Sequence, residues 1–119
     1  MDVAGKAWGM TSKLFMQNNV EVCRIQGKKG GKSSIHRHTS KISMFFVESG
    51  SLLIAVEKND YNLTDKTILL PQQSTIIKPN EYHSFEVLED CVVYEFYWVT
   101  LESEDIERRD VGSGPLPIK

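Results

Sequence analysis

The chain has 119 residues, which is enough for one hydrophobic core and too few for two, so a single domain is expected. Apolar residues make up 40% of the sequence and charged residues 25%, a balance that is typical of soluble globular proteins and excludes a disordered or collagen-like chain. Fourteen Lys and Arg residues against sixteen Asp and Glu residues leave a net charge of −2, so there is no broad positive field, and neither nucleic acid nor a membrane surface is expected as a partner.

Short runs of β-branched and aromatic residues, separated by turn clusters, fill the chain from Lys13 to Thr100. Strands are predicted, in chain order, at residues 20–26, 42–48, 52–56, 61–63, 67–70, 75–78, 83–88 and 91–100. The pair Ser49-Gly50 has the chemistry of a hairpin turn, and Glu89-Asp90 also punctuates the chain. About eight short strands in one small domain indicate an all-β sandwich or barrel.

The end of the chain has a different character. The segment 102–109 carries acidic residues early and two arginines late, the distribution that a helix dipole favours, so one short C-terminal helix is predicted there. Glycines and prolines then predict a flexible tail over 111–119. The single domain is therefore expected to span 1–110.

The cysteines and the start of the chain indicate a compartment. Cys23 and Cys91 are far apart and each lies in an apolar run, so they are expected as buried thiols rather than as a disulfide or a zinc knuckle. The first ten residues lack the features of a secretory signal, and no run approaches the roughly 18 apolar residues of a membrane helix. We therefore expect a cytoplasmic protein.

The three histidines, His36, His38 and His83, are the strongest candidates for chemistry. Residues two apart on an extended strand point to the same face, so His36 and His38 present two imidazoles side by side. His83 follows Pro79 at the start of another alternating strand, on a face that is otherwise apolar. If that face points into a barrel, three imidazoles meet at one ion. The alternative is that the pair lies on a solvated strand and His83 caps a turn.

A site of three neutral imidazoles has a clear ligand preference. It leaves the charge of a divalent ion uncompensated, so anionic or chelating ligands are expected at its open position. Zinc, iron, manganese and nickel all accept imidazole, and the sequence does not choose among them.

This arrangement resembles the cupin family, whose first motif is a glycine, then His-x-His, a glutamate and a glycine, and whose second motif is a proline-led turn before a histidine. Here the first motif spans 30–50 with His36 and His38, and the second spans 77–83 and ends in His83. The resemblance implies a small cupin-type β-barrel, a double-stranded β-helix or jelly roll, with a divalent metal at the three histidines.

More of the chain resembles the C-terminal cupin domain of type II mannose-6-phosphate isomerases. The resemblance spans nearly the whole chain, with matching stretches at Lys6-Ala-Trp8-Gly9, 34–41, Val47-x-Ser49-Gly50 and 104–110. This resemblance implies a metal-dependent isomerase or epimerase, with a sugar phosphate, a nucleotide sugar or another small anion as its partner.

The chain also departs from these patterns. The glutamate ligand of the cupin motif falls at Ser43, which cannot bind a divalent ion as a carboxylate does. Glu48 is an odd number of residues away, so by alternation it points to the opposite face. The isomerase branch usually has Gln in place of His36 and Arg in place of Lys41. These departures remove one anionic ligand and weaken the transfer of the isomerase reaction to this chain.

Three further residues are candidate catalytic groups. Glu95 interrupts an apolar run and shares a face with Tyr97, so it could act as a base or as a late-arriving ligand. The alternative is an ion pair with a residue such as Arg24 on another strand. Tyr82 and Lys41 are candidate substrate contacts at the rim of the barrel.

Three functions remain open at this point. The first is an isomerase or epimerase acting on a sugar phosphate, and the second is a non-catalytic cupin that binds a sugar or another small molecule. The third is an iron dioxygenase with three histidines, because Ser43 removes the anionic ligand. An acid or base beside the metal discriminates an enzyme from a binding module.

The apolar residues exceed what one small barrel interior needs. Residues 44–47 are apolar on both faces of their strand, and Phe96 and Trp98 add aromatic rings on the face opposite Glu95. A second copy of the chain would cover the excess, so a homodimer is predicted.

Overall fold

The computed structural model describes residues 2–58 and 63–99, together with residues 107, 109, 114 and 115. The described residues form an all-β structure of seven strands: β1 (Asp2–Lys6), β2 (Gly9–Gln17), β3 (Val20–Gly27), β4 (Ile42–Lys58), β5 (Leu63–Leu69), β6 (Ser74–Ile77) and β7 (His83–Trp98). Within these ranges, no helix has the length and hydropathy that crossing a bilayer requires. The helix predicted over 102–109 and the tail predicted over 111–119 fall almost entirely outside the described residues.

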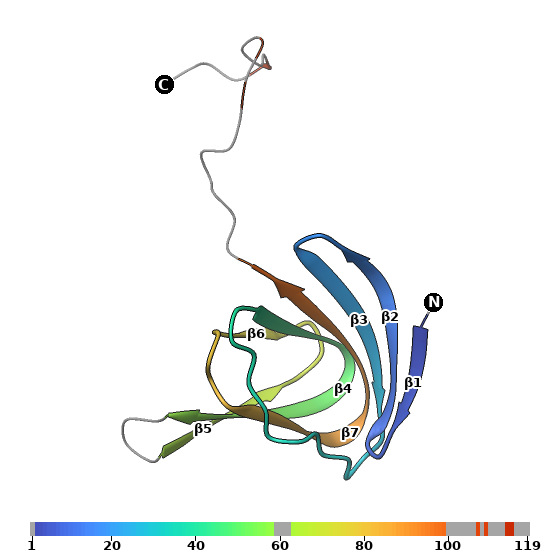
Figure 1. Ribbon diagram of the computed structural model, residues 1–119. Helices are drawn as coiled ribbons and strands as arrows, with labels where there is room; N and C mark the ends of the chain where they lie inside the picture. The colour runs from blue at the N-terminus through green and yellow to red at the C-terminus, as the bar shows by residue number, and fades with distance from the viewer. Residues whose placement is uncertain (1, 59–62, 100–106, 108, 110–113, 116–119) are drawn as a thin grey trace.

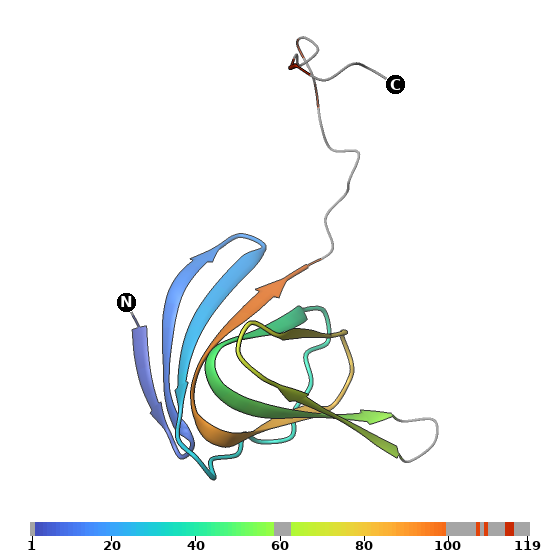
Figure 2. The same ribbon diagram turned by 180° about the vertical axis from the view of Figure 1, so that it is seen from behind.

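All strand pairs are antiparallel, in the order β1-β2-β3-β7-β4-β5, with β6 paired to β4. The two long strands β4 and β7 curve through the middle of the molecule, with β1 to β3 on one side and β5 and β6 on the other (Figures 1 and 2). This arrangement confirms the predicted all-β jelly roll.

The two predicted turns at Ser49-Gly50 and Glu89-Asp90 are wrong. β4 pairs with β7 along both of their lengths, and the register shifts where β4 passes Ser49 and Ser51. Gly50 has φ +79°, and a side chain there would collide with the carbonyl oxygen of Asp90. A glycine at positive φ serves a bulge as well as a hairpin turn, so the sequence signal is the same for both. The strands predicted at 42–48 and 52–56 are therefore one long bent strand, β4, and those predicted at 83–88 and 91–100 correspond to the single strand β7.

The two N-terminal strands, β1 and β2, were not among the predicted strands. The residues of β2 are half-buried or exposed, and the pairing with β3 shifts between Lys13 and Phe15, which breaks the alternation of side chains. The strand predicted at 75–78 corresponds to β6.

The core is formed by inward-facing side chains of β3, β4 and β7. The fully buried apolar residues include Ile25, Phe45, Val47, Leu52, Ile54, Val87 and Val93. Cys23 and Cys91 are buried free thiols, as predicted. Four polar residues are also buried, namely Ser43, Ser51, His83 and Glu95.

The connection between β3 and β4 returns along the first half of β7. The amides of Gly30 and Ser33 donate to carbonyl oxygens of Val87 and Phe85 at 2.9 Å. His36 and His83 then form a β-bridge with both backbone hydrogen bonds, at 3.0 and 2.9 Å. Backbone pairing therefore sets the two histidines side by side, although the segment around His36 is a single bridge and not the regular strand that was expected.

Candidate metal centre

The structure brings the three histidines together. One nitrogen from each of His36, His38 and His83 lies within 4.8 Å of the others. The ring centroids are 4.6 to 5.7 Å apart, and His83 is buried while the other two are half-buried. The amide of Asn80, in the turn before β7, donates to the carbonyl oxygen of His38 at 2.7 Å, which holds the second histidine against the third.

Hydrogen bonds orient two of the rings. Nδ1 of His36 lies 3.0 Å from the carbonyl oxygen of Ser34, and Nδ1 of His83 lies 2.9 Å from that of Glu81. A carbonyl oxygen only accepts, so Nδ1 carries the proton in each neutral ring. The lone pair is then on Nε2, the nitrogen available to a metal.

Three buried side-chain atoms have no hydrogen-bond partner among the described residues: Nε2 of His38, Nε2 of His83 and Oγ of Ser43. Buried polar atoms are nearly always satisfied, so such atoms need an explanation. Two of the three are imidazole nitrogens in one cluster, and a cation is the partner that their lone pairs fit. Ser43 faces the same interior, opposite Tyr97, whose ring packs edge-on against His38 at 5.3 Å.

The surroundings of His38 and His83 favour the neutral form of their rings. Burial lowers the pKa of His38, and the neighbouring His36 and His83 lower it further. Burial also lowers the pKa of His83, partly opposed by its hydrogen bond to Glu81. Neutral imidazole is the form that binds a metal, so both rings are ready for one near neutral pH.

A cavity of about 670 Å³ reaches the histidine cluster at His36. Its apolar wall includes Trp8, Ile25, Phe45 and Phe85, and its polar wall includes Ser34, His36, Glu95 and Tyr97. Lys6, Lys13 and Lys32 also line it. The volume is that of a typical small-molecule site, with apolar walls and a few convergent polar groups.

Glu95 lies on the wall of this cavity. It is 7% exposed, and burial raises its pKa from 4.5 to about 7, with a hydrogen bond from Tyr97 opposing the rise. The alternative ion pair with Arg24 does not form. In the register of β3 and β7, Arg24 lies opposite Tyr94 and Cys23 lies opposite Glu95, so Arg24 points to the other face of the sheet. A buried carboxyl group that titrates near neutral pH has the properties of an acid or base.

Lys41 lies near the histidines but does not line the large cavity. Its ammonium is 3.8 Å from Glu21 and 4.8 Å from the ring centroid of Tyr97. Tyr82 is also absent from the cavity wall, and its ring lies under the guanidinium of Arg37. Of the three candidate catalytic residues, only Glu95 therefore lines this cavity.

Glu21, Cys23 and Tyr97 were not identified as site residues from the sequence. All three face inward and line the cavity. The signal was present in the alternation of β3, where the inward positions run Glu21, Cys23, Ile25. The Cys23 thiol donates to Glu21 at 3.4 Å, and burial raises its pKa to about 11, so it is no nucleophile.

The fold is the cupin jelly roll, and its three histidines lie close enough together to share one ion. KdgF from Halomonas sp. is similar, with a TM-score of 0.72 and 14% identity over 85% of this chain and 90% of that one. An RmlC-like cupin from Shewanella frigidimarina has a TM-score of 0.69 and 14% identity over 87% of this chain and 86% of its own. Oxalate decarboxylase from Bacillus subtilis, described with Mn(II) centres, has a TM-score of 0.74 and 13% identity over 88% of this chain and 29% of its own.

These similarities concern the fold, because all three identities are below 15%. No protein-family model and no curated protein matches the sequence.

Proposed function

We propose that the protein is a metal-dependent cupin enzyme that transfers a proton on a small anionic ligand. The ligand class is a sugar phosphate, as the resemblance to type II mannose-6-phosphate isomerases implies. The proposal rests on the position of Glu95: this carboxyl group is buried, its pKa is raised to about 7, and it lines the same cavity as His36. It is the acid or base that distinguishes an enzyme from a binding module. The two free thiols support a reducing cytoplasm as the compartment.

Nε2 of His36, His38 and His83 would hold the ion, and zinc, iron, manganese and nickel all suit imidazole. When bound, a divalent ion supplies positive charge that polarises hydroxyl and carbonyl oxygens of the ligand. Ser43 adds no negative charge to the site, which favours an anionic ligand.

The chain's own residues supply the remaining functions. Glu95 accepts a proton from one carbon of the ligand and returns it to the adjacent carbon. The Tyr97 hydroxyl stays protonated, because burial and the nearby Glu95 raise its pKa, and it steadies the carboxyl group by hydrogen bonding. The apolar wall excludes water, and Lys6 and Lys13 attract the phosphate. In this proposal Lys41 acts through Glu21 and Tyr97, and Tyr82 contributes only at the rim.

Metal-stripped and Mn²⁺-loaded protein would be incubated with mannose 6-phosphate in D₂O. Exchange of the proton beside the carbonyl is expected only in the loaded protein, and His36→Ala should abolish it. Glu95→Gln should retain binding but lose at least about 100-fold in exchange. Glu48→Gln is the matched control, because Glu48 is an exposed carboxylate on the outer face of β4, and its exchange should equal that of the wild type.

Ser43 favours a second candidate, a cupin without isomerase activity. Without a carboxylate ligand, the centre suits non-catalytic binding or the three-histidine iron chemistry of a dioxygenase. Metal-dependent binding of the sugar phosphate without proton exchange would establish the binding module. Failure of the loaded protein to bind any sugar phosphate would overturn the ligand class.

We also propose that the protein is a homodimer. Facing residues of five neighbouring strands form an outer apolar row: Phe15, Val22, Phe96, Met44 and Ile76. Phe15 is 49% and Ile76 56% exposed, whereas Phe45 and Val47 are fully buried inside the barrel. A second copy of the same row is the partner that we propose for this face, since a symmetric dimer buries identical patches against each other.

A further inference from the structure

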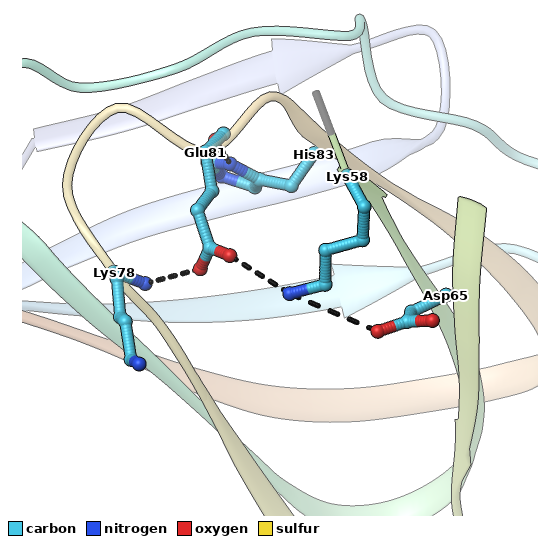
Figure 3. Close-up of polar contacts among 5 residues, drawn as sticks. All are labelled: Lys58, Asp65, Lys78, Glu81 and His83. Atoms are coloured by element: carbon cyan, nitrogen blue, oxygen red, sulfur yellow. Dashed lines mark hydrogen bonds and ion pairs between the residues drawn. The ribbon is translucent and has the colours of Figure 1, made fainter. Parts of the chain in front are cut away.

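A polar network of Lys58, Asp65, Lys78 and Glu81 lies beside His83 (Figure 3). The carboxylate of Glu81, in the turn between β6 and β7, accepts from the Lys58 ammonium at 2.9 Å and from the Lys78 amide at 2.9 Å. Lys58, at the end of β4, is also 3.7 Å from the carboxylate of Asp65 on β5. Both carboxylate oxygens of Glu81 are therefore engaged.

This network closes the turn before His83 on the side of Lys58 and Lys78. Two backbone hydrogen bonds hold the same segment elsewhere, from the Asn80 amide to the His38 carbonyl at 2.7 Å and from the Glu57 amide to the Tyr82 carbonyl at 2.9 Å. Asn80 has φ +68°, a conformation that asparagine tolerates but does not strongly prefer. The backbone hydrogen bond across the turn, from the Glu81 amide to the Lys78 carbonyl, is long at 3.4 Å. The shorter contact from the Lys78 amide to the Glu81 side chain closes the same turn more firmly.

The carbonyl oxygen of the same residue holds the His83 ring. It lies 2.9 Å from Nδ1, and Figure 3 shows the ring beside the backbone of Glu81. The opposite nitrogen, Nε2, is the buried atom without a partner. The position of one carbonyl group thus decides both the tautomer of His83 and the direction of its free lone pair.

We propose that Glu81 is a positioning residue of the metal centre. Its carboxylate, held between Lys58 and the Lys78 amide, sets the turn so that its carbonyl oxygen keeps Nδ1 of His83 protonated and Nε2 directed at the ion. The inference rests on the proposed metal site. It adds a residue that does not touch the ion and that the histidine pattern does not reveal.

The ion pair between Lys32 and Glu86 provides a matched comparison, because Glu86 lies on β7, the strand that carries His83. Its atoms are 3.9 Å apart and its side chains are 70% and 36% exposed, against 2.9 Å, 41% and 23% for Lys58 and Glu81. Glu86 lies three residues beyond His83, on the outward face of β7. An exposed pair of this kind has little effect on its surroundings, so Glu86→Ala is the control.

The experiment combines a metal-free and a metal-bound measurement on the full chain. In the metal-free protein, ¹⁵N chemical shifts of the imidazoles report the tautomer of His83. In the loaded protein, Co²⁺ titration followed by d–d absorption reports affinity and coordination geometry. The variants are Glu81→Ala, Glu81→Gln and Lys58→Met, with Glu86→Ala as the control, and the unfolding temperature of each is recorded.

Glu81→Ala is expected to bind Co²⁺ about 10- to 100-fold more weakly and to show a mixture of His83 tautomers. Glu81→Gln should recover most of the affinity, because an amide oxygen still accepts from the Lys78 amide. Lys58→Met should lie between the two, and Glu86→Ala should match the wild type. If Glu81→Ala does not fold, the inference is tested with Glu81→Gln and Lys58→Met alone, and the expected results for these two variants stay the same.

Unchanged tautomer and Co²⁺ affinity in the variants would overturn the inference, even if the unfolding temperature falls, because Glu81 would then be only structural. Failure of wild-type protein to bind Co²⁺ would instead overturn the proposed metal site. In that case the tautomer in the metal-free variants still decides whether Glu81 positions the His83 ring.

Discussion

At the scale of single residues, the two inward carboxylates of the cavity differ in their partners. The carboxylate of Glu21 lies 3.8 Å from the ammonium of Lys41 and accepts a hydrogen bond from the Cys23 thiol. Glu95 is buried beside Tyr97 and has no salt bridge among the described residues. The same residue type therefore has two electrostatic environments in one cavity, and burial poises Glu95 to exchange a proton near neutral pH.

Glu95→Gln is expected to change the pH dependence of stability. Burial raises the pKa of Glu95 from 4.5 to about 7, so between these values the folded state binds the proton more tightly than the unfolded state. The wild type thus loses stability as pH rises from 4.5 through 7, and the variant does not. Urea unfolding at pH 8 should show the variant more stable by up to about 3 kcal/mol, with little difference at pH 4.5. An equal difference at both pH values would contradict this assignment.

At the scale of elements, the bend shared by β4 and β7 shapes the barrel. Both strands continue through it, so one residue pair, Gly50 against Asp90, lets two long strands curve around the core instead of ending in turns. The early half of β7 then receives the returning segment that carries His36. The position of the histidine cluster therefore depends on this bend.

Gly50→Ala is expected to destabilise the fold by about 2 to 4 kcal/mol, because the new methyl group meets the Asp90 carbonyl and the residue stays at φ +79°. Gly30→Ala is the matched control. Gly30 has φ +88°, but a side chain there meets nothing within 4 Å. Its loss should be limited to about 1 kcal/mol of backbone strain. Urea unfolding measures both, and equal losses would mean that close packing at Asp90 is unimportant.

At the scale of the whole molecule, the two faces of the sheet differ in how much of their apolar surface is covered. The inner face of β3, β4 and β7 is covered by the barrel itself and contains the core and the cavity. The outer face carries the outer apolar row, whose ends at Phe15 and Ile76 are about half exposed. Burying such a row in a dimer would remove apolar surface from water at about 25 cal/mol per Å².

Sedimentation at micromolar concentration should therefore find a dimer. Phe15→Lys, at one end of the row, should weaken the dimer at least about tenfold, since burying a charge in an apolar contact is costly. Leu63→Lys is the control, because Leu63 is 59% exposed on β5, outside the row. A wild-type monomer, or equal effects of both substitutions, would refute the proposed interface.

The sequence by itself determined the all-β class, the buried thiols and the three histidines as one candidate set, while the jelly roll was implied by the resemblance to the cupin family. These predictions depend on local information, since alternation along a strand decides which side chains face inward. The spacing of His36 and His38 and the proline before His83 were enough to nominate the ligands. For the same reason, inward-facing Glu95 could be nominated before its surroundings were known.

Only the tertiary structure decided the bend at Gly50, the pairing of His36 with His83, and the environments of Glu21, Glu81 and Glu95. Gly50 looks the same in a hairpin turn and in a bent strand, and the partner strand decides between them. The tautomer of His83 depends on one carbonyl group in a turn held by Lys58, which is 23 residues away from Glu81. Such features arise from contacts between distant segments, and these contacts leave no periodic signal in the chain.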